Sequence, residues 1–498
     1  MNILFKTSKL SVAIIIVIAG LVVINFLAGQ WFKRWDLTAN SIYSLSQVSQ
    51  QTVAELPEEL NIEVVFGPEL PSQYINLQQT VNDILAEYAS YSSKIKITAV
   101  TPEEIENKAQ ELRLPQVQFN TVRKDKLEVL NGYLGLALHY QEQTETIPVI
   151  QDTSNLEYQI TSLIKKISSP VTPIIGVVQS HGALNLDQDI STAYNELKKL
   201  YQVRRVDLSS EEAIANDIQT LIIPAPQTLI EPAELQKIDD WLLSGKSALI
   251  LAEANSMAGN LAWHQSANNL SDWLADYGLI LNQDFVLDKV NAMAPFNQGF
   301  ITFNVNYPFW PKITNANFNQ TVPAVAKLEG VVLPWTTSLE IDQSIAEQAQ
   351  ILAHSSEQAW VKSGEYTLLP NQELYNNEEL KSYNFIIKVQ SLTNLPSEKN
   401  NSDSQLIVVA DSDFITDSIV QRYPANLMLW QNLIDNLSLD SDLATIRAKE
   451  ITERPIKELT TAQRRWLRYG NVFGLTIIII ALGLLRYYWR RKFNNFSL

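Results

Sequence analysis

The spacing of hydrophobic positions predicts alternating strands and helices between residues 60 and 168. Short runs rich in Ile and Val, at Ile62–Phe66, Lys94–Val100 and Val117–Val122, are typical of buried strands. Apolar residues at helical spacing predict helices over Tyr74–Tyr91 and Pro102–Leu112, the second beginning with proline at its first position. The remaining predicted elements are a hairpin over Leu127–Tyr140 and Thr144–Ile150 and a helix over Leu156–Ile167.

The resulting order, βαβαββα, is that of thioredoxin-like domains, and we assign residues 31–168 to such a domain. A redox thioredoxin requires two cysteines directly after its first strand. Here that position reads Gly67-Pro68-Glu69-Leu70-Pro71, and the chain contains no cysteine. The sequence therefore predicts a thioredoxin-like fold without redox chemistry, and it excludes disulfides, thiolate metal sites and cysteine nucleophiles.

Residues 170–450 show a second pattern, in which apolar strands alternate with helices. This alternation predicts a parallel sheet covered on both faces, as in flavodoxin-like and glutamine-amidotransferase-like α/β domains. A strand at Leu406–Ala410 and a helix over Asn426–Leu437 are expected to return to the same sheet. Residues 285–380 are rich in Asn, Pro and aromatic residues and have weak periodicity, so we expect an irregular insertion there. The other predicted elements are strands at Ile174–Val178, Gln202–Val206, Thr220–Ile223 and Ala248–Ala252, and helices at Ile190–Leu200 and Pro232–Leu243.

Two hydrophobic runs near the ends of the chain predict transmembrane helices at residues 10–29 and 469–489. The first run carries no charge and is long enough to cross a bilayer. A cleaved signal peptide is the alternative, but its exit lacks a small-x-small cleavage site. The second run is uncharged up to Leu485 and ends in a tyrosine- and tryptophan-rich group. A buried core helix is the alternative there, and the basic C-terminal tail disfavours it.

The distribution of charge predicts the membrane topology. Residues 1–29 and 471–498 together hold six of the 38 basic residues and none of the 54 acidic ones, so the middle of the chain carries a net charge of −22. Short basic ends favour the cytoplasmic side. The sequence therefore predicts a two-pass protein of the inner (plasma) membrane, with both termini cytoplasmic and a large extracytoplasmic region. Nucleic-acid binding is disfavoured, because the net negative charge of the middle region would repel a phosphate backbone.

Four polar residues stand where an open parallel sheet binds ligands, beyond the carboxyl ends of its strands. His181 and Gly182 follow the first predicted strand of the second domain, and Asp411 and Asp413 follow its last. We regard these four as candidate ligand-binding residues. The alternative is that they cap turns or are ordinary polar loop residues.

The sequence predicts no catalytic residues. Ser256 follows a predicted strand, but it has no Gly-x-Ser-x-Gly elbow and no base near it in sequence. The chain has neither a GxxxxGK[ST] phosphate loop nor a GxGxxG fingerprint, so it is not itself an ATPase or a dinucleotide enzyme. The four histidines match no metal-ligand spacing: His139, His181, His264 and His354. We expect no metal and no cofactor.

Short segments along nearly the whole chain share one resemblance. The most recognisable is Arg34-Trp35-Asp36-Leu37-Thr38 with Tyr43-Ser44-Leu45-Ser46, just after the first hydrophobic run. In chain order, the others are Gln179-Ser180-His181-Gly182, Tyr277-Gly278-Leu279 with Leu287-Asp288, Tyr307-Pro308-Phe309-Trp310-Pro311, Pro334-Trp335-Thr336-Thr337-Ser338-Leu339, Asp411-Ser412-Asp413-Phe414 and Leu459-Thr460-Thr461-Ala462-Gln463. Together they resemble the Gldg family, the auxiliary component of ABC-type transport systems that is named for gliding motility.

The resemblance implies an inner-membrane protein that works with a separate ATPase and permease, and it implies no catalytic residue. The family's usual Gly-His-Gly-Glu is Ser180-His181-Gly182-Ala183 here, and its usual Gly-Asp-Ser-Asp is Ala410-Asp411-Ser412-Asp413. The leading hypothesis is therefore a non-catalytic auxiliary subunit that binds an extracytoplasmic ligand or partner and couples it to a transporter. The alternatives are a degenerate or cryptic cell-envelope hydrolase and a structural envelope tether.

Overall fold

The computed structural model describes residues 44–438, apart from 68–69, 124–125, 154, 170–172, 258–260, 299–300, 365–367, 371–378 and 391–403, together with a few isolated positions between 468 and 486. The described residues before Glu450 belong to one compact unit. The predicted span at residues 10–29 lies outside the described residues, and the span at 469–489 does so except at isolated positions. Among the helices that are described, none has the length and hydrophobicity needed to cross a membrane.

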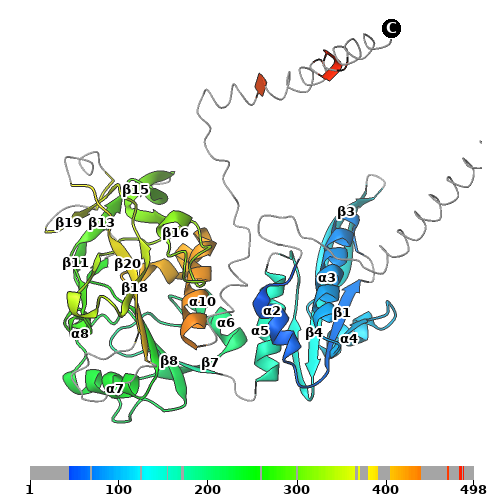
Figure 1. Ribbon diagram of the computed structural model, residues 1–498, viewed down its shortest axis with the longest axis horizontal. Helices are drawn as coiled ribbons and strands as arrows, with labels where there is room; N and C mark the ends of the chain where they lie inside the picture. The colour runs from blue at the N-terminus through cyan, green and yellow to red at the C-terminus, as the bar shows by residue number, and fades with distance from the viewer. Residues whose placement is uncertain are drawn as a thin grey trace, which may run out of the picture. The chain divides into compact units, whose positions relative to one another are not determined.

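The first lobe, residues 44–169, is a five-stranded mixed sheet with helices (Figure 1). Strands β1 and β2 pair in parallel, β4 runs antiparallel to β1, and β3 and β5 both pair antiparallel with β4. The elements lie close to those predicted, except that the second predicted helix begins at Ile105 rather than at Pro102. Residues 102–104 form a turn there, in which Glu104 N donates to Thr101 O. The bounds are α2 Gln47–Ala54, β1 Leu60–Gly67, α3 Ser72–Tyr91, β2 Ile95–Ala99, α4 Ile105–Glu111, β3 Val117–Arg123, β4 Lys126–Tyr140, β5 Gln143–Ile147 and α5 Leu156–Ser168.

The Ser44-Leu45-Ser46 segment has a structural role at the start of this lobe. Leu45 is buried in the lobe's core, and Ser46 is the N-cap of α2, with its Oγ accepting from Ser49 N at 3.2 Å. Glu157 of α5 accepts from Ser46 N at 2.6 Å and from Ser49 Oγ at 2.7 Å. These hydrogen bonds attach α2 to α5 and fix the point at which the chain enters the folded region.

The second lobe, residues 173–438, is built on a nine-stranded sheet in the order β12-β17-β20-β21-β9-β8-β6-β7, with β18 paired to β20. The run from β7 to β21 is parallel, and β20, β17 and β12 extend it antiparallel. The predicted return of residues 406–410 to this sheet is confirmed by the parallel pairing of β21 with β9. The bounds here are β6 Ile174–Val178, α6 Ser191–Leu200, β7 Gln202–Val206, β8 Ile218–Pro224, α7 Pro232–Leu243, β9 Ser247–Leu251, β20 Asn384–Gln390, β21 Gln405–Val409, α9 Asp417–Arg422 and α10 Pro424–Ser438.

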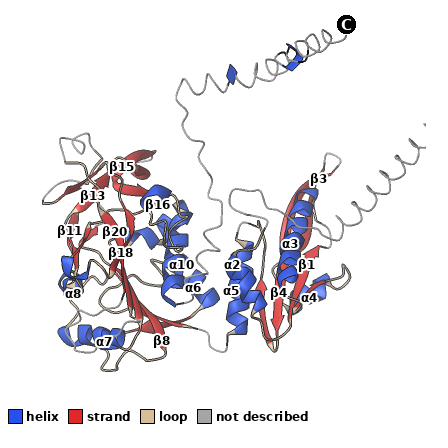
Figure 2. Ribbon diagram, in the orientation of Figure 1, coloured by secondary structure: helices blue, strands red, loops and turns tan. Residues whose placement is uncertain are grey.

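Residues 285–380, where the sequence predicts an irregular insertion, contain several regular strands among their described residues (Figure 2). Its longest feature is the antiparallel hairpin of β14 and β15, and two of its strands, β17 and β18, join the main sheet. A register shift between Asn291 and Met293, together with prolines inside the strands, breaks the twofold alternation that would reveal them in sequence. The additional elements are β10 Asn255–Met257, β11 Trp263–Gln265, α8 Leu270–Asp276, β12 Leu279–Leu281, β13 Phe285–Asp288, β14 Asn291–Gln298, β15 Ile301–Ile313, β16 Val331–Val332, β17 Leu339–Ile341, β18 Ala349–His354 and β19 Ala359–Lys362.

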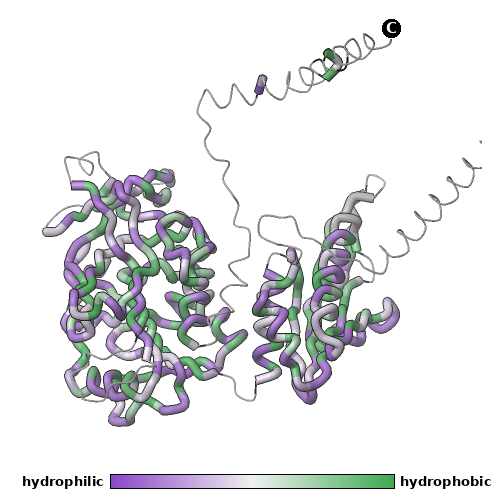
Figure 3. The backbone as a smooth tube through the Cα atoms, in the orientation of Figure 1, coloured by the Kyte–Doolittle hydropathy of each residue, from purple (hydrophilic) through white to green (hydrophobic). Residues whose placement is uncertain are grey.

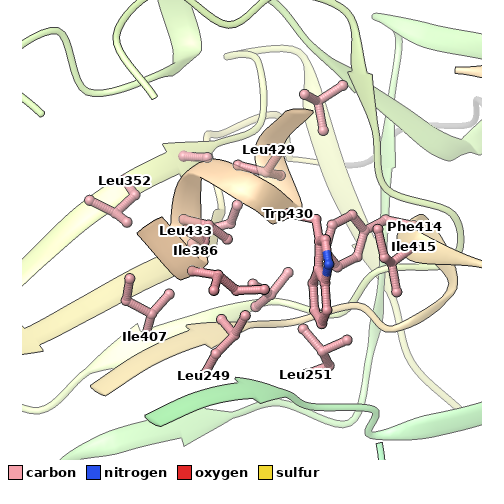
Figure 4. Close-up of a cluster of buried hydrophobic side chains, with 14 of the residues drawn as sticks. Leu249, Leu251, Leu352, Ile386, Ile407, Phe414, Ile415, Leu429, Trp430 and Leu433 are labelled. Carbon is pink, nitrogen blue, oxygen red and sulfur yellow. The ribbon is translucent and has the colours of Figure 1, made fainter. Parts of the chain in front are cut away.

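Hydrophobic and hydrophilic positions alternate along both lobes (Figure 3), and the largest core of the second lobe lies between α10 and the main sheet. Trp430 of α10 is fully buried there. Phe414 and Ile415, from the loop after β21, pack beside it (Figure 4). Burial of these two side chains fixes the loop that carries Asp411 and Asp413. The other labelled members of the cluster are Leu249, Leu251, Leu352, Ile386, Ile407, Leu429 and Leu433.

Candidate functional site

The carboxyl ends of β9 and β21 bring two acidic loops together. These neighbouring strands are parallel, with Val409 opposite Leu251, so both chains leave the sheet at the same edge. Glu253 lies two residues beyond β9, and Asp411 lies two residues beyond β21. Repulsion from Glu253 contributes to the raised pKa values of both Asp411 and Asp413.

A small pocket opens between these loops. It offers about 10 Å³ to the centre of a water-sized sphere, which is close to the minimum for one water molecule. Three carboxyl groups, one amide side chain and one indole line it. The lining residues are Glu253, Ala254, Asn255, Pro334, Trp335, Thr337, Ala410, Asp411, Ser412 and Asp413.

Hydrogen bonds fix both the carbonyl group that precedes Asp411 and its side chain. The preceding carbonyl, Ala410 O, accepts from Thr336 Oγ1 at 2.9 Å and from Thr337 N at 3.1 Å. Asp411 Oδ1 accepts from Phe414 N at 3.0 Å. The side chain is 3 % exposed, and among the described residues its other oxygen, Oδ2, has no hydrogen-bond partner. A rigid, buried and unsatisfied acceptor of this kind is costly to stability, which is typical of a functional site.

Helix α10 supports the acidic loop from beneath. Asn426 is fully buried, and its Nδ2 donates to Phe414 O at 2.8 Å and to Val332 O at 2.7 Å. Its Oδ1 accepts from Val332 N at 2.9 Å. One side chain therefore ties the loop after β21 to strand β16, and the position of the pocket depends on it.

The electrostatics of the pocket disfavour three ionised carboxylates. Burial raises the pKa of Asp411 well above its usual range, and repulsion by Asp413 and Glu253 adds to the effect. Burial and then repulsion by Glu253 raise the pKa of Asp413 to about 8. Burial also raises the pKa of Glu253, although hydrogen bonds from Gln227 and Ser412 partly oppose this. The cluster therefore retains protons at neutral pH unless a cation enters it.

Two further residues shape the pocket. Asn255 is 5 % exposed, and its Nδ2 donates to Asp284 O at 2.8 Å, which fixes the orientation of the amide. Its Oδ1 is buried and has no partner among the described residues. Trp335 has a left-handed backbone (φ 54°), its backbone N donates to Phe309 O at 2.7 Å, and its indole packs edge-on against Trp310. Left-handed backbone is uncommon for a bulky residue and is often found at binding sites.

His181 and Gly182 do not line this pocket. His181 Nε2 lies 3.0 Å from Glu234 Oε2, and Glu234 is the residue that completes the capping box of α7. Both His181 and Gly182 have left-handed backbone, and a Cβ on Gly182 would lie 3.2 Å from Gln227 Cβ. The tight turn docks the loop after β8, because His181 O accepts from Gln227 N at 2.8 Å. His181 and Gly182 therefore hold this turn against the loop after β8.

Of the four residues predicted as ligand-binding, the structure places Asp411 and Asp413 in the pocket. Glu253 and Asn255 were missed. Glu253 follows an apolar strand, as Asp411 does, and this was the available signal. Gln227 connects the turn at His181 to the pocket, because its Nε2 donates to Glu253 Oε2 at 2.8 Å.

The structure also gives Ser256 a neighbour that is remote in sequence. Strands β10 and β11 pair antiparallel, with Ser256 opposite His264. Directly opposed residues have Cβ atoms about 5 Å apart. The side chain of Ser256 lies outside the described residues, and His264 is exposed.

In the part of the chain that the structure describes, no three Asp, Glu, His or Cys side chains are placed to share one ion.

These features define a mixed α/β protein with a small acidic pocket at the carboxyl edge of its main sheet. A family model described as an ABC-type uncharacterized transport system matches residues 172–442, more than half of the chain. The chain therefore belongs to this family of auxiliary transport-system proteins. Residues 39–139 match a second model, described as a domain of unknown function.

Similar proteins are distant. An uncharacterized protein of Borreliella burgdorferi is 23 % identical over 481 residues, which cover 92 % of this chain and 94 % of that protein. Among solved structures, the mmIFT52 N-terminal domain is 12 % identical with a TM-score of 0.36, over 53 % of this chain and 96 % of that chain. A β-galactosidase from Bacillus circulans sp. alkalophilus is 11 % identical with a TM-score of 0.28, over 57 % of this chain and 33 % of that chain. A ThuA-like protein from Parabacteroides merdae is 8 % identical with a TM-score of 0.25, over 58 % of this chain and 95 % of that chain. At these TM-scores the structural likenesses do not bear on the site.

Proposed function

We propose that the chain is a non-catalytic auxiliary subunit of an ABC-type transport system, which binds a ligand at the acidic pocket and couples its occupancy to a permease and an ATPase. The observation that carries this proposal is Asp411, a buried carboxylate with one oxygen held by Phe414 N and the other unpartnered among the described residues. A preorganised acceptor without a partner in the protein is suited to a ligand. Membership of the transport-system family supports the proposal that the chain works with a transporter.

The experiment uses cells that carry the intact transport system and the double variant Asp411→Asn, Asp413→Asn. Asn keeps the shape of each side chain, so the chain should fold and assemble while transport is lost. The matched control is Asp276→Asn, which removes an exposed acid at the end of α8. Wild-type transport by a correctly assembled double variant would refute the role of the pocket.

The proposal includes a two-pass anchor in the inner membrane, with both termini cytoplasmic and the two lobes extracytoplasmic. The basic ends and the hydrophobic runs at residues 10–29 and 469–489 support this arrangement. A reporter fused after Leu498 should be cytoplasmic, and one inserted within residues 397–404 should be extracytoplasmic. Finding both reporters on the same side would contradict the topology.

The register of Ser256 against His264 favours one second candidate, a cell-envelope hydrolase. A serine nucleophile requires a base within hydrogen-bond reach, and this pairing brings an imidazole near it. Turnover of ester substrates by the purified full-length protein, abolished by Ser256→Ala and retained by Asp411→Asn, would establish that function. We expect no turnover.

A further inference from the structure

The chemistry of the acidic pocket restricts the group that it can bind. Two buried oxygens face no donor among the described residues: Asp411 Oδ2 and Asn255 Oδ1. The Asn255 acceptor is independent of the acidic cluster, and its orientation is fixed because Nδ2 already donates to Asp284 O. Asn255 Oδ1 is an acceptor, and Asp411 Oδ2 accepts once its carboxyl group is ionised, so the complementary ligand group is a hydrogen-bond donor.

The charge of the pocket indicates that this donor is cationic. Glu253, Asp411 and Asp413 are the titratable side chains that line it, and among the described residues none of them forms an ion pair with a lysine, arginine or histidine. Burial raises the pKa of all three groups in the unbound protein, and repulsion between carboxylates adds to the rise at Asp411 and Asp413. A bound cation would offset the repulsion and displace a proton.

The size of the pocket selects among cations. A space of about 10 Å³ for a water-sized sphere accommodates one nitrogen with its hydrogens. A planar guanidinium or a trimethylammonium group is several times larger. A primary ammonium carries three N–H donors and no acceptor, which suits two unpartnered oxygens and a further carboxylate.

We infer that the acidic pocket binds the primary ammonium group of a small amine, held by Asp411 and Asn255, while Asp413 and Glu253 line the pocket around it. This inference rests on the proposed binding function and specifies its ligand class. Trp335 forms part of the wall around the group, and the remainder of the ligand extends outward from the pocket mouth.

The test uses the full-length protein purified in detergent and three probes at constant ionic strength. Methylammonium chloride supplies the group itself, tetramethylammonium chloride supplies the charge without N–H donors, and calcium chloride supplies a divalent metal. We expect a saturable rise in melting temperature with methylammonium alone. Asp411→Asn and Asn255→Leu should each weaken its apparent Kd by about tenfold, which is the usual consequence of losing one charge-assisted or buried acceptor. Asp276→Asn should leave the Kd unchanged.

Equal responses to methylammonium and tetramethylammonium would overturn the inference, because charge alone would then account for binding. A response to calcium without one to methylammonium would instead establish a metal site. The absence of a saturable response to any of the three probes would also overturn the ammonium inference. The wild-type comparison of the three probes needs no variant, so the inference stays testable even if Asn255→Leu fails to fold.

Failure of this inference is distinguishable from failure of the proposed function. If Asp411→Asn, Asp413→Asn abolishes transport in cells while methylammonium does not bind, the pocket serves transport but its ligand is not an amine. If methylammonium binds and the same double variant transports normally, the amine site is real and the proposed function of the pocket is wrong.

Discussion

The carboxyl group of Asp413 should destabilise the folded protein at neutral pH, and Asp413→Asn should therefore stabilise it. Burial, with repulsion by Glu253, raises the pKa of Asp413 from 3.8 to about 8. Between these two values the native state holds a proton that the unfolded state has lost. Stability from this group is thus fully present below pH 3.8 and is lost as the pH rises through 8.

The magnitude follows from the size of the pKa difference. At pH 7 the pH lies about three units above the pKa of Asp413 in the unfolded state. Keeping the group protonated in the folded state therefore lowers the free energy of unfolding by roughly 4 kcal/mol, at about 1.4 kcal/mol per unit. Asp413 keeps partial exposure, and it shares repulsion with Glu253, so screening should reduce the effect to roughly 2 kcal/mol. The gain for Asp413→Asn should be near zero at pH 4 and should reach its full value above pH 8.

The assay is urea unfolding of the full-length protein in detergent, followed by tryptophan fluorescence at pH 4, 6 and 8. The matched control, Asp417, lies four residues further along the chain, at the first position of α9. Asp417 accepts from Ser191 Oγ at 2.6 Å, Ser191 N at 3.1 Å and Thr192 N at 2.8 Å at the start of α6. Burial opposes ionisation of Asp417, but these hydrogen bonds outweigh it and lower the pKa. Asp417→Asn should therefore cost about 1 kcal/mol at pH 7.

The two variants should thus move stability in opposite directions at pH 7. A destabilised Asp413→Asn protein, or a gain that does not grow between pH 4 and pH 8, would refute the electrostatic account of the pocket. Stabilisation accompanied by loss of transport would be the expected signature of a binding site that is maintained at a cost to the fold.

Two further predictions concern packing and a buried cation, and urea unfolding tests both. Gly278 has φ +75°, and an added Cβ would lie 2.7 Å from Ile345, so Gly278→Ala should lower the free energy of unfolding by about 3 kcal/mol. Gly364 has φ +89° but nothing within 4 Å of an added Cβ, so Gly364→Ala should lower it by only about 1 kcal/mol. Equal losses would show that backbone strain alone is responsible. Burial lowers the pKa of Lys388 from 10.5 to about 8. The native state therefore holds fewer protons between these values, and stability should rise with pH across that window by up to about 3 kcal/mol. Lys388→Met should flatten this rise, and an unchanged slope would contradict the assignment.

Local sequence pattern was sufficient for most individual elements. The Ile- and Val-rich runs of β1, β6 and β9 can be recognised as strands from the sequence, because both faces of each strand are buried and carry apolar residues. The helices α3 and α10 show helical spacing over several turns. Where local pattern failed, as at β14 and β15, prolines and a register shift removed the alternation on which the prediction relied.

The composition of the site could be predicted only in part. Asp411 and Asp413 were accessible to sequence reasoning because a polar residue after a buried strand lies at the ligand-binding edge of a parallel sheet. His181 met the same criterion, yet its imidazole lies 3.0 Å from the carboxylate of Glu234 and outside the acidic pocket. Sequence specifies the edge at which a side chain emerges but not the partner toward which it turns.

Tertiary structure alone decided which loops meet. Glu253 and Asp411 become neighbours because β9 and β21, far apart in the chain, pair in parallel in the main sheet. The antiparallel addition of β20 and the buried amide of Asn426 then fix the loop after β21. Long-range backbone hydrogen bonds set this strand order, and the spacing of hydrophobic residues within each strand carries no record of it. The sequence by itself therefore determined a two-part, acidic α/β chain with hydrophobic ends, and the order of strands in the sheet determined its pocket.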